Sequence, residues 1–157
     1  MANTPQKIHV DAIEKEVVGN GDKFAATIGT ITQLMGMTKL GCTMVEIEPG
    51  KRAWPYHLHY GQEELFIILE GEGTLRYDDE EYPITQGEIF FAPIGEGTAH
   101  QIMNTSDTPM RYLALSSMSD PEVCYYPDSQ KYGSYSDLGL QFLSRKESAV
   151  EYMDGEV

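Results

Sequence analysis

The chain has 157 residues, enough to form one domain with a substantial core, and its 41% hydrophobic content is ordinary for a globular protein. Its 25 acidic and 11 basic residues give a formal net charge of −14. Such a surface repels nucleic-acid phosphates and anionic lipids, so we expect neither nucleic acid nor a membrane as a partner. A small anionic ligand stays open, because a metal or a few cations can dominate a pocket locally.

The N-terminus and the cysteines bear on the compartment. The first ten residues, MANTPQKIHV, contain no apolar signal core, and the longest bulky apolar run, residues 65–69, is too short to span a bilayer. Cys42 and Cys124 form neither a disulfide framework nor a Cys-x-x-Cys pair, which favours two free thiols in a reducing compartment. We therefore expect a soluble, cytoplasmic protein.

Strand-like patterns dominate the middle of the chain. Residues 1–23 carry weak signals and are interpreted as an N-terminal arm. From Phe24 the residues read as strands, and Thr43, Val45 and Ile47 alternate with their neighbours as in a strand. Further candidate strands bounded by Gly, Pro, Asn or Asp cover residues 63–71, 72–81, 81–93, 99–104 and 110–118, with a polar hairpin turn over 77–82. No segment between residues 24 and 118 has a convincing 3.6-residue period.

These patterns predict an all-β fold, and a small antiparallel barrel or jelly roll would protect the sheet edges. We interpret residues 1–157 as a single domain with its core over about residues 24–118. Residues 119–157 are rich in aromatic residues and are interpreted as a C-terminal strap that packs on the barrel or on a second subunit. A loosely ordered terminus is the open alternative. The rings in question belong to Tyr125, Tyr126, Tyr132, Tyr135 and Phe142.

Two histidines and a glutamate form the first candidate site. His57 and His59 project to the same side of a strand, because residues two apart share a face. If the turn at residues 60–62 brings Glu64 opposite His59, two imidazoles and a carboxylate converge inside the barrel, which suits Zn, Fe, Mn or Ni. The alternative is a set of histidines with ordinary structural roles. Burying Glu64 without a cation or hydrogen bonds would be costly, which favours the metal.

A second stretch, GEIFFAPIGEGTAHQIMN, supplies a third imidazole. Gly87 opens a strand, Pro93 closes it, and a Gly-containing loop leads to His100, with Asn104 four positions later.

Together the two stretches resemble the two motifs of the cupin superfamily. The first has Gly50, His57-x-His59, Glu64 and Gly71, and the second runs from Gly87 to Asn104. The first has one extra residue before His57, and the second has a loop about two residues longer than usual. The match covers roughly residues 41–118 and implies a double-stranded β-helix that binds one divalent metal. By this resemblance the metal ligands are His57, His59, Glu64 and His100.

A cage of three histidines and one glutamate leaves one or two positions for water or substrate, as in a catalytic or ligand-binding metal site. The residues after Arg111 are similar to a group of small bacterial cupins often labelled sugar-phosphate isomerases. This favours a metal-dependent isomerase or lyase acting on a small oxygenated molecule. An Fe(II)-dependent dioxygenase and a non-enzymatic binder or sensor stay open, and we expect a homodimer.

Two further features would be needed for sugar-phosphate chemistry. An isomerase needs a group that transfers a proton, but Glu63 is expected to face away from the barrel lumen. Tyr56, Tyr60 and Tyr77 are near the site in sequence only. A phosphate would need a cation, and the arginines on or beside core strands are Arg52, Arg76 and Arg111. No motif marks any of them as a phosphate ligand, and Arg76 and Arg111 fit equally well on the acidic outer face.

Overall fold

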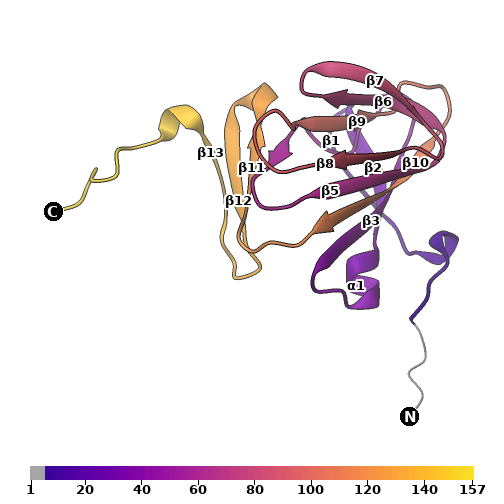
Figure 1. The fold of residues 1–157 in the computed structure, drawn as a ribbon, viewed down its shortest axis with the longest axis horizontal. Helices are drawn as coiled ribbons and strands as arrows, with labels where there is room; N and C mark the ends of the chain where they lie inside the picture. The colour runs from indigo at the N-terminus through magenta and orange to yellow at the C-terminus, as the bar shows by residue number, and fades with distance from the viewer. Residues whose placement is uncertain (1–5) are drawn as a thin grey trace, which may run out of the picture.

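The computed structural model describes residues 6–157, which are mostly β-strand (Figure 1). Residues 1–5 of the predicted arm lie outside the described residues. The strands are β1 (Glu16–Asn20), β2 (Phe24–Thr30), β3 (Leu40–Ile47), β4 (Leu58–His59), β5 (Glu64–Glu70), β6 (Glu72–Tyr77), β7 (Glu80–Thr85), β8 (Ile89–Ala92), β9 (His100–Met103), β10 (Met110–Ser117), β11 (Glu122–Tyr126), β12 (Lys131–Tyr135) and β13 (Gln141–Arg145). The helices are α1 (Ile31–Met35) and three 3₁₀ turns, η1 (Val10–Ala12), η2 (Pro127–Ser129) and η3 (Lys146–Ser148).

Three sheets arrange these strands, and every pair within them is antiparallel. A six-stranded sheet has the order β1-β2-β3-β10-β5-β8, and a three-stranded sheet has the order β7-β6-β9. A four-stranded sheet, β13-β12-β11-β4, joins the C-terminal strands to the short strand that carries His59. Strand β1, which lies in the predicted arm, is the edge of the six-stranded sheet. The division into arm, core and strap stays a prediction.

The main hydrophobic core lies between the six-stranded and the three-stranded sheet. Because side chains alternate between the two faces of a strand, every second residue of β3 and β5 points into this core. The almost fully buried side chains are Val45 and Ile47 of β3 and Phe66 and Ile68 of β5. Leu75, Ile84 and Ile102 meet them from the other sheet. Full burial of such side chains contributes about 1.5–3 kcal/mol each, so this packing holds the barrel together.

A short helix interrupts the region that was predicted to contain strands only. Residues 31–35 form α1, and Gly36 ends it in the left-handed conformation with φ 61°. Five residues are too few to show a helical period, which is why the pattern was missed. The helix covers the outer face of β3, where Met44 is fully buried in a second cluster with Ile31 and Ile13.

The turns follow the predicted chemistry. The polar turn at 77–82 joins β6 to β7 as a hairpin, and its two central residues, Asp78 and Asp79, have positive φ, as a type I′ turn requires. Gly71 separates β5 from β6 with φ 79°, and a Cβ there would lie 2.7 Å from the carbonyl oxygen of Pro109. A side chain at this position would therefore be both strained and obstructed.

The predicted strap is ordered in its first part and exposed in its last. Strands β11 to β13 form a sheet, and the rings of Tyr125 and Tyr132 lie 4.6 Å apart. Phe142, which was expected to pack, is half exposed. The residues after η3 extend away from the barrel (Figure 1), and Tyr152 is almost fully exposed.

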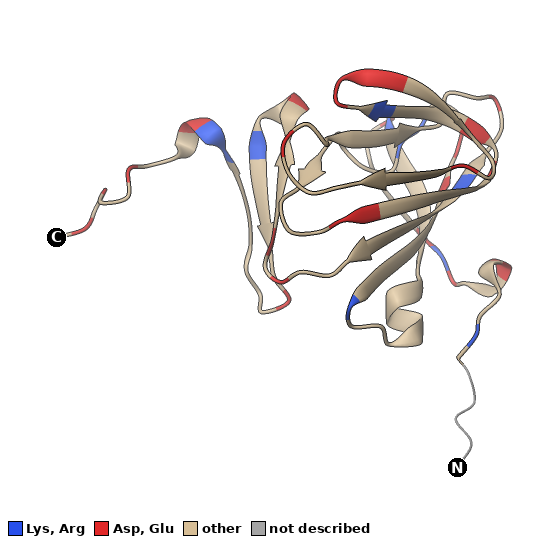
Figure 2. Cartoon of the chain, viewed as in Figure 1, with Lys and Arg blue, Asp and Glu red and all other residues tan. Residues whose placement is uncertain are grey.

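Within residues 6–157, no helix has the length and apolar character needed to cross a membrane. Acidic residues occur in several strands and in many of the turns (Figure 2). They cluster at the hairpin between β6 and β7, where four follow one another from Asp78 to Glu81.

Candidate metal centre

Separate strands bring the four predicted ligands to one place. His59 lies in β4 with His57 just before it, Glu64 begins β5 and His100 begins β9. The backbones of the two motifs pair directly: His57 N donates to the carbonyl of His100 at 3.2 Å, and His100 N donates to the carbonyl of His57 at 2.8 Å. This two-way bond fixes the distance between residues 43 positions apart in sequence.

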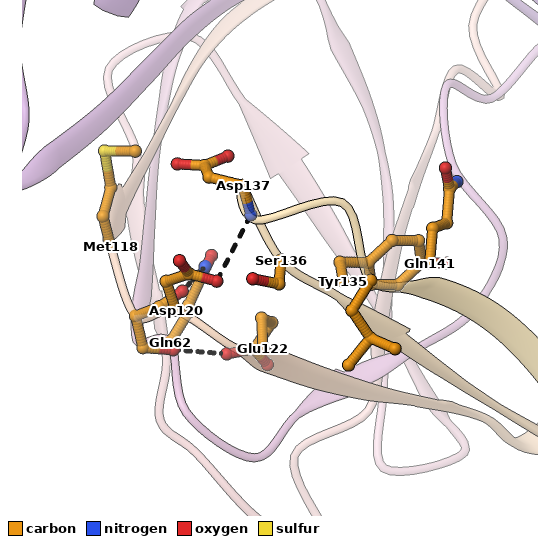
Figure 3. Close-up of a pocket in the computed structure, with 10 residues that line it drawn as sticks. Gln62, Met118, Asp120, Glu122, Tyr135, Ser136, Asp137 and Gln141 are labelled. Atoms are coloured by element: carbon orange, nitrogen blue, oxygen red, sulfur yellow. Dashed lines mark hydrogen bonds between the residues drawn. The ribbon is translucent and has the colours of Figure 1, made fainter.

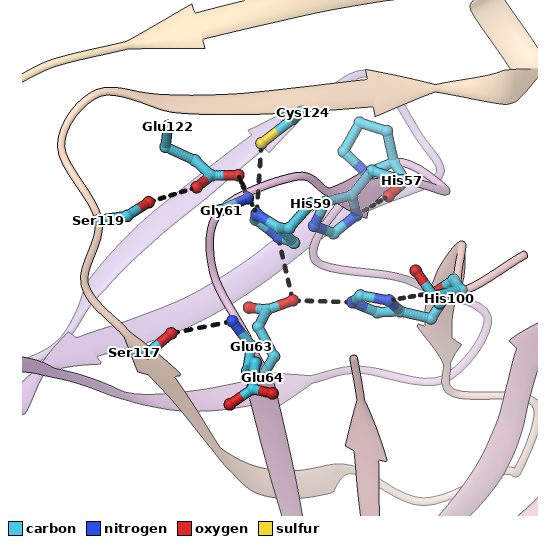
Figure 4. A network of polar contacts seen from close by, with 12 residues as sticks. His57, His59, Gly61, Glu63, Glu64, His100, Ser117, Ser119, Glu122 and Cys124 are labelled. Atoms are coloured by element: carbon cyan, nitrogen blue, oxygen red, sulfur yellow. Dashed lines mark hydrogen bonds and ion pairs between the residues drawn. The ribbon is translucent and has the colours of Figure 1, made fainter. Parts of the chain in front are cut away.

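The ligand atoms of His57, His59, Glu64 and His100 all lie within 4.8 Å of one another. Glu64 Oε2 lies 2.9 Å from His100 Nε2 and 3.1 Å from His59 Nε2 (Figure 4). The ring centroid of His57 is 4.9 Å from those of both other histidines. The convergence expected from the sequence is therefore present, while binding of a metal stays a prediction.

The other nitrogen of each ring is held by a separate acceptor. His57 Nδ1 lies 2.7 Å from the carbonyl of Pro55, and His100 Nδ1 lies 3.1 Å from that of Thr98. His59 Nδ1 lies 3.2 Å from Glu122 Oε1. Carbonyl and carboxylate oxygens accept, so each Nδ1 carries a hydrogen, which leaves Nε2 of each ring as the nitrogen that could bind a metal.

Burial and the neighbouring charges perturb the pKa values strongly. Removal of the ring from water, followed by repulsion from His100 and His59, lowers the pKa of His57 to about 3. Burial also disfavours the charged form of His59, but the polar contacts around that ring outweigh it and raise its pKa to about 12. Burial works against ionisation of Glu64, yet hydrogen bonds with His100 and His59 hold its pKa well below its usual range.

A metal ion fits this set of donors. His59 Nε2 is buried and makes no hydrogen bond of good geometry within the described residues, although it lies 3.1 Å from Glu64 Oε2. A buried nitrogen that faces a carboxylate and two further imidazoles is satisfied by a shared cation. Three nitrogens and one oxygen suit Zn, Fe, Mn or Ni.

Two residues at this site were not anticipated from the sequence. Strand β11 pairs with β4 in the register Cys124↔His59, which places Cys124 Sγ 3.4 Å and Glu122 Oε1 3.2 Å from His59 Nδ1. Glu122 is 5% exposed and is itself held by Ser119 Oγ at 2.7 Å. The only sequence signal was an acid and a cysteine two apart in the predicted strap, which share a face if that segment is extended.

Glu122 also lines a small cavity of about 240 Å³ (Figure 3). Asp120 and Asp137 line it, and Asp137 N donates to Asp120 Oδ1 at 3.3 Å. None of the four predicted ligands lines this cavity, so we assign it no part in the chemistry.

The predicted proton-transfer candidates do not face the cluster. Tyr56 is buried, and its hydroxyl accepts from Asp79 N at 2.9 Å. The ring of Tyr60 stacks with that of Tyr132, and the ring of Tyr77 packs edge-on against Phe90. Glu63 is exposed, as expected from strand alternation with Glu64.

Two of the three arginines are paired on the surface. Arg76 binds Asp79 and Asp128, and Arg111 binds Asp11 and Glu70. Arg52 has no carboxylate within 4 Å among the described residues.

A cavity of about 200 Å³ opens at the cluster. His57, His59 and Glu64 line one side, and Thr43, Ser116 and Trp54 are among the residues on the others. The cavity is small and partly polar, which suits a small oxygenated molecule. Glu64 is the one carboxylate on its wall within the described residues.

Comparison with known proteins now identifies the family. Residues 43–116 match the family model described as Cupin domain. Residues 43–116 are therefore a cupin domain. Its fold is the double-stranded β-helix that the two motifs predicted, and both motifs lie in or beside the matched segment.

Solved structures and curated sequences agree with this assignment. A protein of Acidithiobacillus ferrooxidans, provisionally named a sugar phosphate isomerase, is 28% identical with a TM-score of 0.75, covering 81% of this chain and 80% of that one. A cupin of Silicibacter pomeroyi named a sugar phosphate isomerase is 24% identical with a TM-score of 0.81, covering 95% and 98%, and supports the fold alone. The oxalate-binding protein of Thermotoga maritima is 37% identical over 59 residues, 38% of this chain and 47% of that protein. The chain spans about half the length of the curated relatives it matches.

Proposed function

We propose that this cupin holds a divalent transition metal with His57, His59, Glu64 and His100 and isomerises a small oxygenated molecule, such as a hydroxy-ketone or a sugar derivative. The orientation of the three imidazoles carries the proposal. Each Nδ1 is bound to an acceptor outside the cluster, so Nε2 of each ring is the nitrogen that would bind the metal. The 28% identity to the provisionally named isomerase supports the reaction class.

In this proposal the metal supplies Lewis acidity toward two neighbouring substrate oxygens. The chain contributes a small cavity that limits the size of the substrate. It also contributes a carboxylate on the wall, Glu64, which stays ionised at neutral pH because the imidazoles stabilise its charge.

Oε1 of Glu64 is our candidate for moving the proton, because Oε2 is the oxygen that would bind the metal. Its Oε2 is engaged by His59 and His100, whereas no hydrogen bond engages Oε1 within residues 6–157. An isomerisation removes a proton from the carbon beside a carbonyl and returns it to the adjacent carbon, and a carboxylate oxygen can carry it between them. The same group can serve a lyase that begins by the same proton abstraction.

The test combines metal analysis with proton exchange. Protein purified without a nickel column is analysed for metal, and candidate hydroxy-ketones, sugars and keto acids are incubated with it in D₂O under NMR. We expect about one metal per chain and metal-dependent exchange of the proton beside the carbonyl, lost in His100→Ala and kept in His9→Ala, which changes the one histidine outside the cluster. Consumption of O₂ with iron bound would instead assign a dioxygenase. Saturable binding without turnover would assign a sensor.

A further inference from the structure

A second cavity, outside the ligand cluster, gathers positive charge. It has a volume of about 620 Å³, within the range typical of small-molecule sites. Its walls come from β1 and β2, from residues 52–56 and from the turn between β11 and β12. Three of the chain's 11 basic residues line it: Lys23, Arg52 and Lys131.

These cations are not neutralised by the protein. Within residues 6–157 none of them has a carboxylate oxygen within 4 Å, although the chain carries 25 acids. The one acid on the cavity wall, Asp128, is already bound by Arg76 Nη1 through both oxygens, at 3.0 and 2.9 Å. In so acidic a protein, three cations that line one cavity without a carboxylate partner form a local positive field that attracts an anion. One of them, Lys131, places its Nζ 4.9 Å from the ring centroid of Tyr126.

Arg52 is fixed in position by its neighbours. Its guanidinium lies over the ring of Phe24, 5.8 Å from the centroid, and its Nη1 donates to Gln101 Oε1 at 3.3 Å. Its Nε is buried without a hydrogen-bond partner in the described part of the chain. A guanidinium held in this way is prepared to bind an oxyanion, because little side-chain freedom is lost when the ligand arrives.

The rest of the wall is apolar and aromatic. Phe24, Trp54 and Tyr56 are among the lining residues, and Trp54, which is 38% exposed, also borders the cavity at the ligand cluster. Aromatic faces beside cations recognise a ligand that has a ring or an apolar body next to its anionic group.

We infer that this cavity binds a small phosphate monoester whose phosphate meets Arg52, Lys23 and Lys131 and whose body lies on Trp54. Phosphate is favoured over carboxylate because three cations line the cavity and a phosphate monoester offers more charge and three acceptor oxygens. The inference is independent of the proposed isomerisation, since none of the four candidate metal ligands lines this cavity.

Trp54 reports on the cavity directly, because it is the single tryptophan of the chain. Its fluorescence is followed in the full-length, metal-containing protein as phenyl phosphate is added at constant ionic strength, with benzoate and phenol in parallel. We expect a saturable change with phenyl phosphate, weaker binding of benzoate and none of phenol. Tighter binding of benzoate than of phenyl phosphate, or no saturable change, would overturn the assignment.

Paired double variants test the cations. Lys23 is exposed and Lys131 partly so, and Lys23→Gln/Lys131→Gln should raise the Kd for phenyl phosphate at least about tenfold, because charge-assisted hydrogen bonds are lost. The control, Lys7→Gln/Lys39→Gln, removes the same charge from exposed lysines outside the cavity and should change the Kd less than about twofold. Equal weakening by the control would reduce the effect to net charge and refute the site.

Chelation of the metal separates the two cavities that share Trp54. The phenyl phosphate response should survive chelation. A response that is lost with the metal but kept in Lys23→Gln/Lys131→Gln would place the phosphate at the ligand cluster and refute the second site.

Discussion

Replacing Glu122 with alanine tests whether the C-terminal strap orients a metal ligand. Glu122 Oε1 accepts from His59 Nδ1 at 3.2 Å, and the same carboxylate accepts from Gly61 N at 3.3 Å and Ser119 Oγ at 2.7 Å. The contacts with Gly61 and Ser119 therefore hold the Glu122 side chain in place independently of His59. We expect the variant to keep its fold and to bind the metal more weakly.

The size of the effect follows from the contacts. Loss of a hydrogen-bonded partner behind a ligating histidine typically lowers metal affinity about 10- to 100-fold, or about 1.4–2.7 kcal/mol. Complete loss is not expected, because Cys124 Sγ lies 3.4 Å from the same nitrogen and still accepts its hydrogen. Glu122→Gln should lose about tenfold at most, since its amide oxygen keeps an acceptor facing Nδ1. The donors left unpaired by alanine should lower the free energy of unfolding by about 1–3 kcal/mol.

Competition against a chromophoric chelator measures the affinity, and thermal circular dichroism measures the stability. Glu63→Ala is the matched control, because this exposed glutamate neighbours the ligand Glu64 but points away from the cluster. If Glu122→Ala binds metal as tightly as the unmodified protein, or if Glu63→Ala loses as much, the assignment of Glu122 as a positioning residue is wrong.

Other predictions concern the ligands, the fold and the assembly. His59→Ala or Glu64→Ala should abolish stoichiometric metal binding and keep β-rich circular dichroism, with His9→Ala unchanged; full metal retention by elemental analysis would contradict the ligand set. Asn104→Ala should lower the free energy of unfolding by about 2–4 kcal/mol in urea titration, because the buried amide donates to two carbonyls and accepts twice from Ser106. Metal stoichiometry should be unaffected, and an unchanged urea midpoint would refute this role. The chain should form a homodimer, because exposed apolar residues such as Phe142 lie in β13 and the tail. A mass of 17.6 kDa, that of one chain, measured by light scattering at micromolar concentration would refute this prediction.

The parts of the site that rest on local geometry could be predicted from the sequence. His57 and His59 share a direction because they are two apart in extended chain, and Glu64 lies on the buried face of β5 with Phe66 for the same reason. The spacing of the two motifs added His100. Asn104 was part of the same pattern, but its role, holding the turn after β9, became clear only from its hydrogen bonds.

The parts that were missed depend on contacts between distant segments. Glu122 is 63 residues from His59, and the short pairing of β11 with β4 decides that they meet. The unpaired state of Arg52 likewise depends on where all the acids lie, and no local pattern distinguishes it from Arg76 or Arg111. The helix α1 was missed because five residues carry too little periodicity.

Strand β11 of the strap contributes side chains that contact the candidate ligands. Glu122, Cys124 and Tyr126 are spaced two apart and share a face, which the strand turns toward the first histidine motif. The first two contact His59 Nδ1, and the ring of Tyr126 stacks on that of His57 with centroids 5.9 Å apart. Two of the four candidate ligands are thus oriented from outside the segment that matches the family model. It follows that the candidate ligands lie in the shared barrel, whereas the pKa of His59 depends both on Cys124 and Glu122 of the strap and on Glu64 of the barrel. The contribution of the strap can therefore differ between cupins that carry the same four residues.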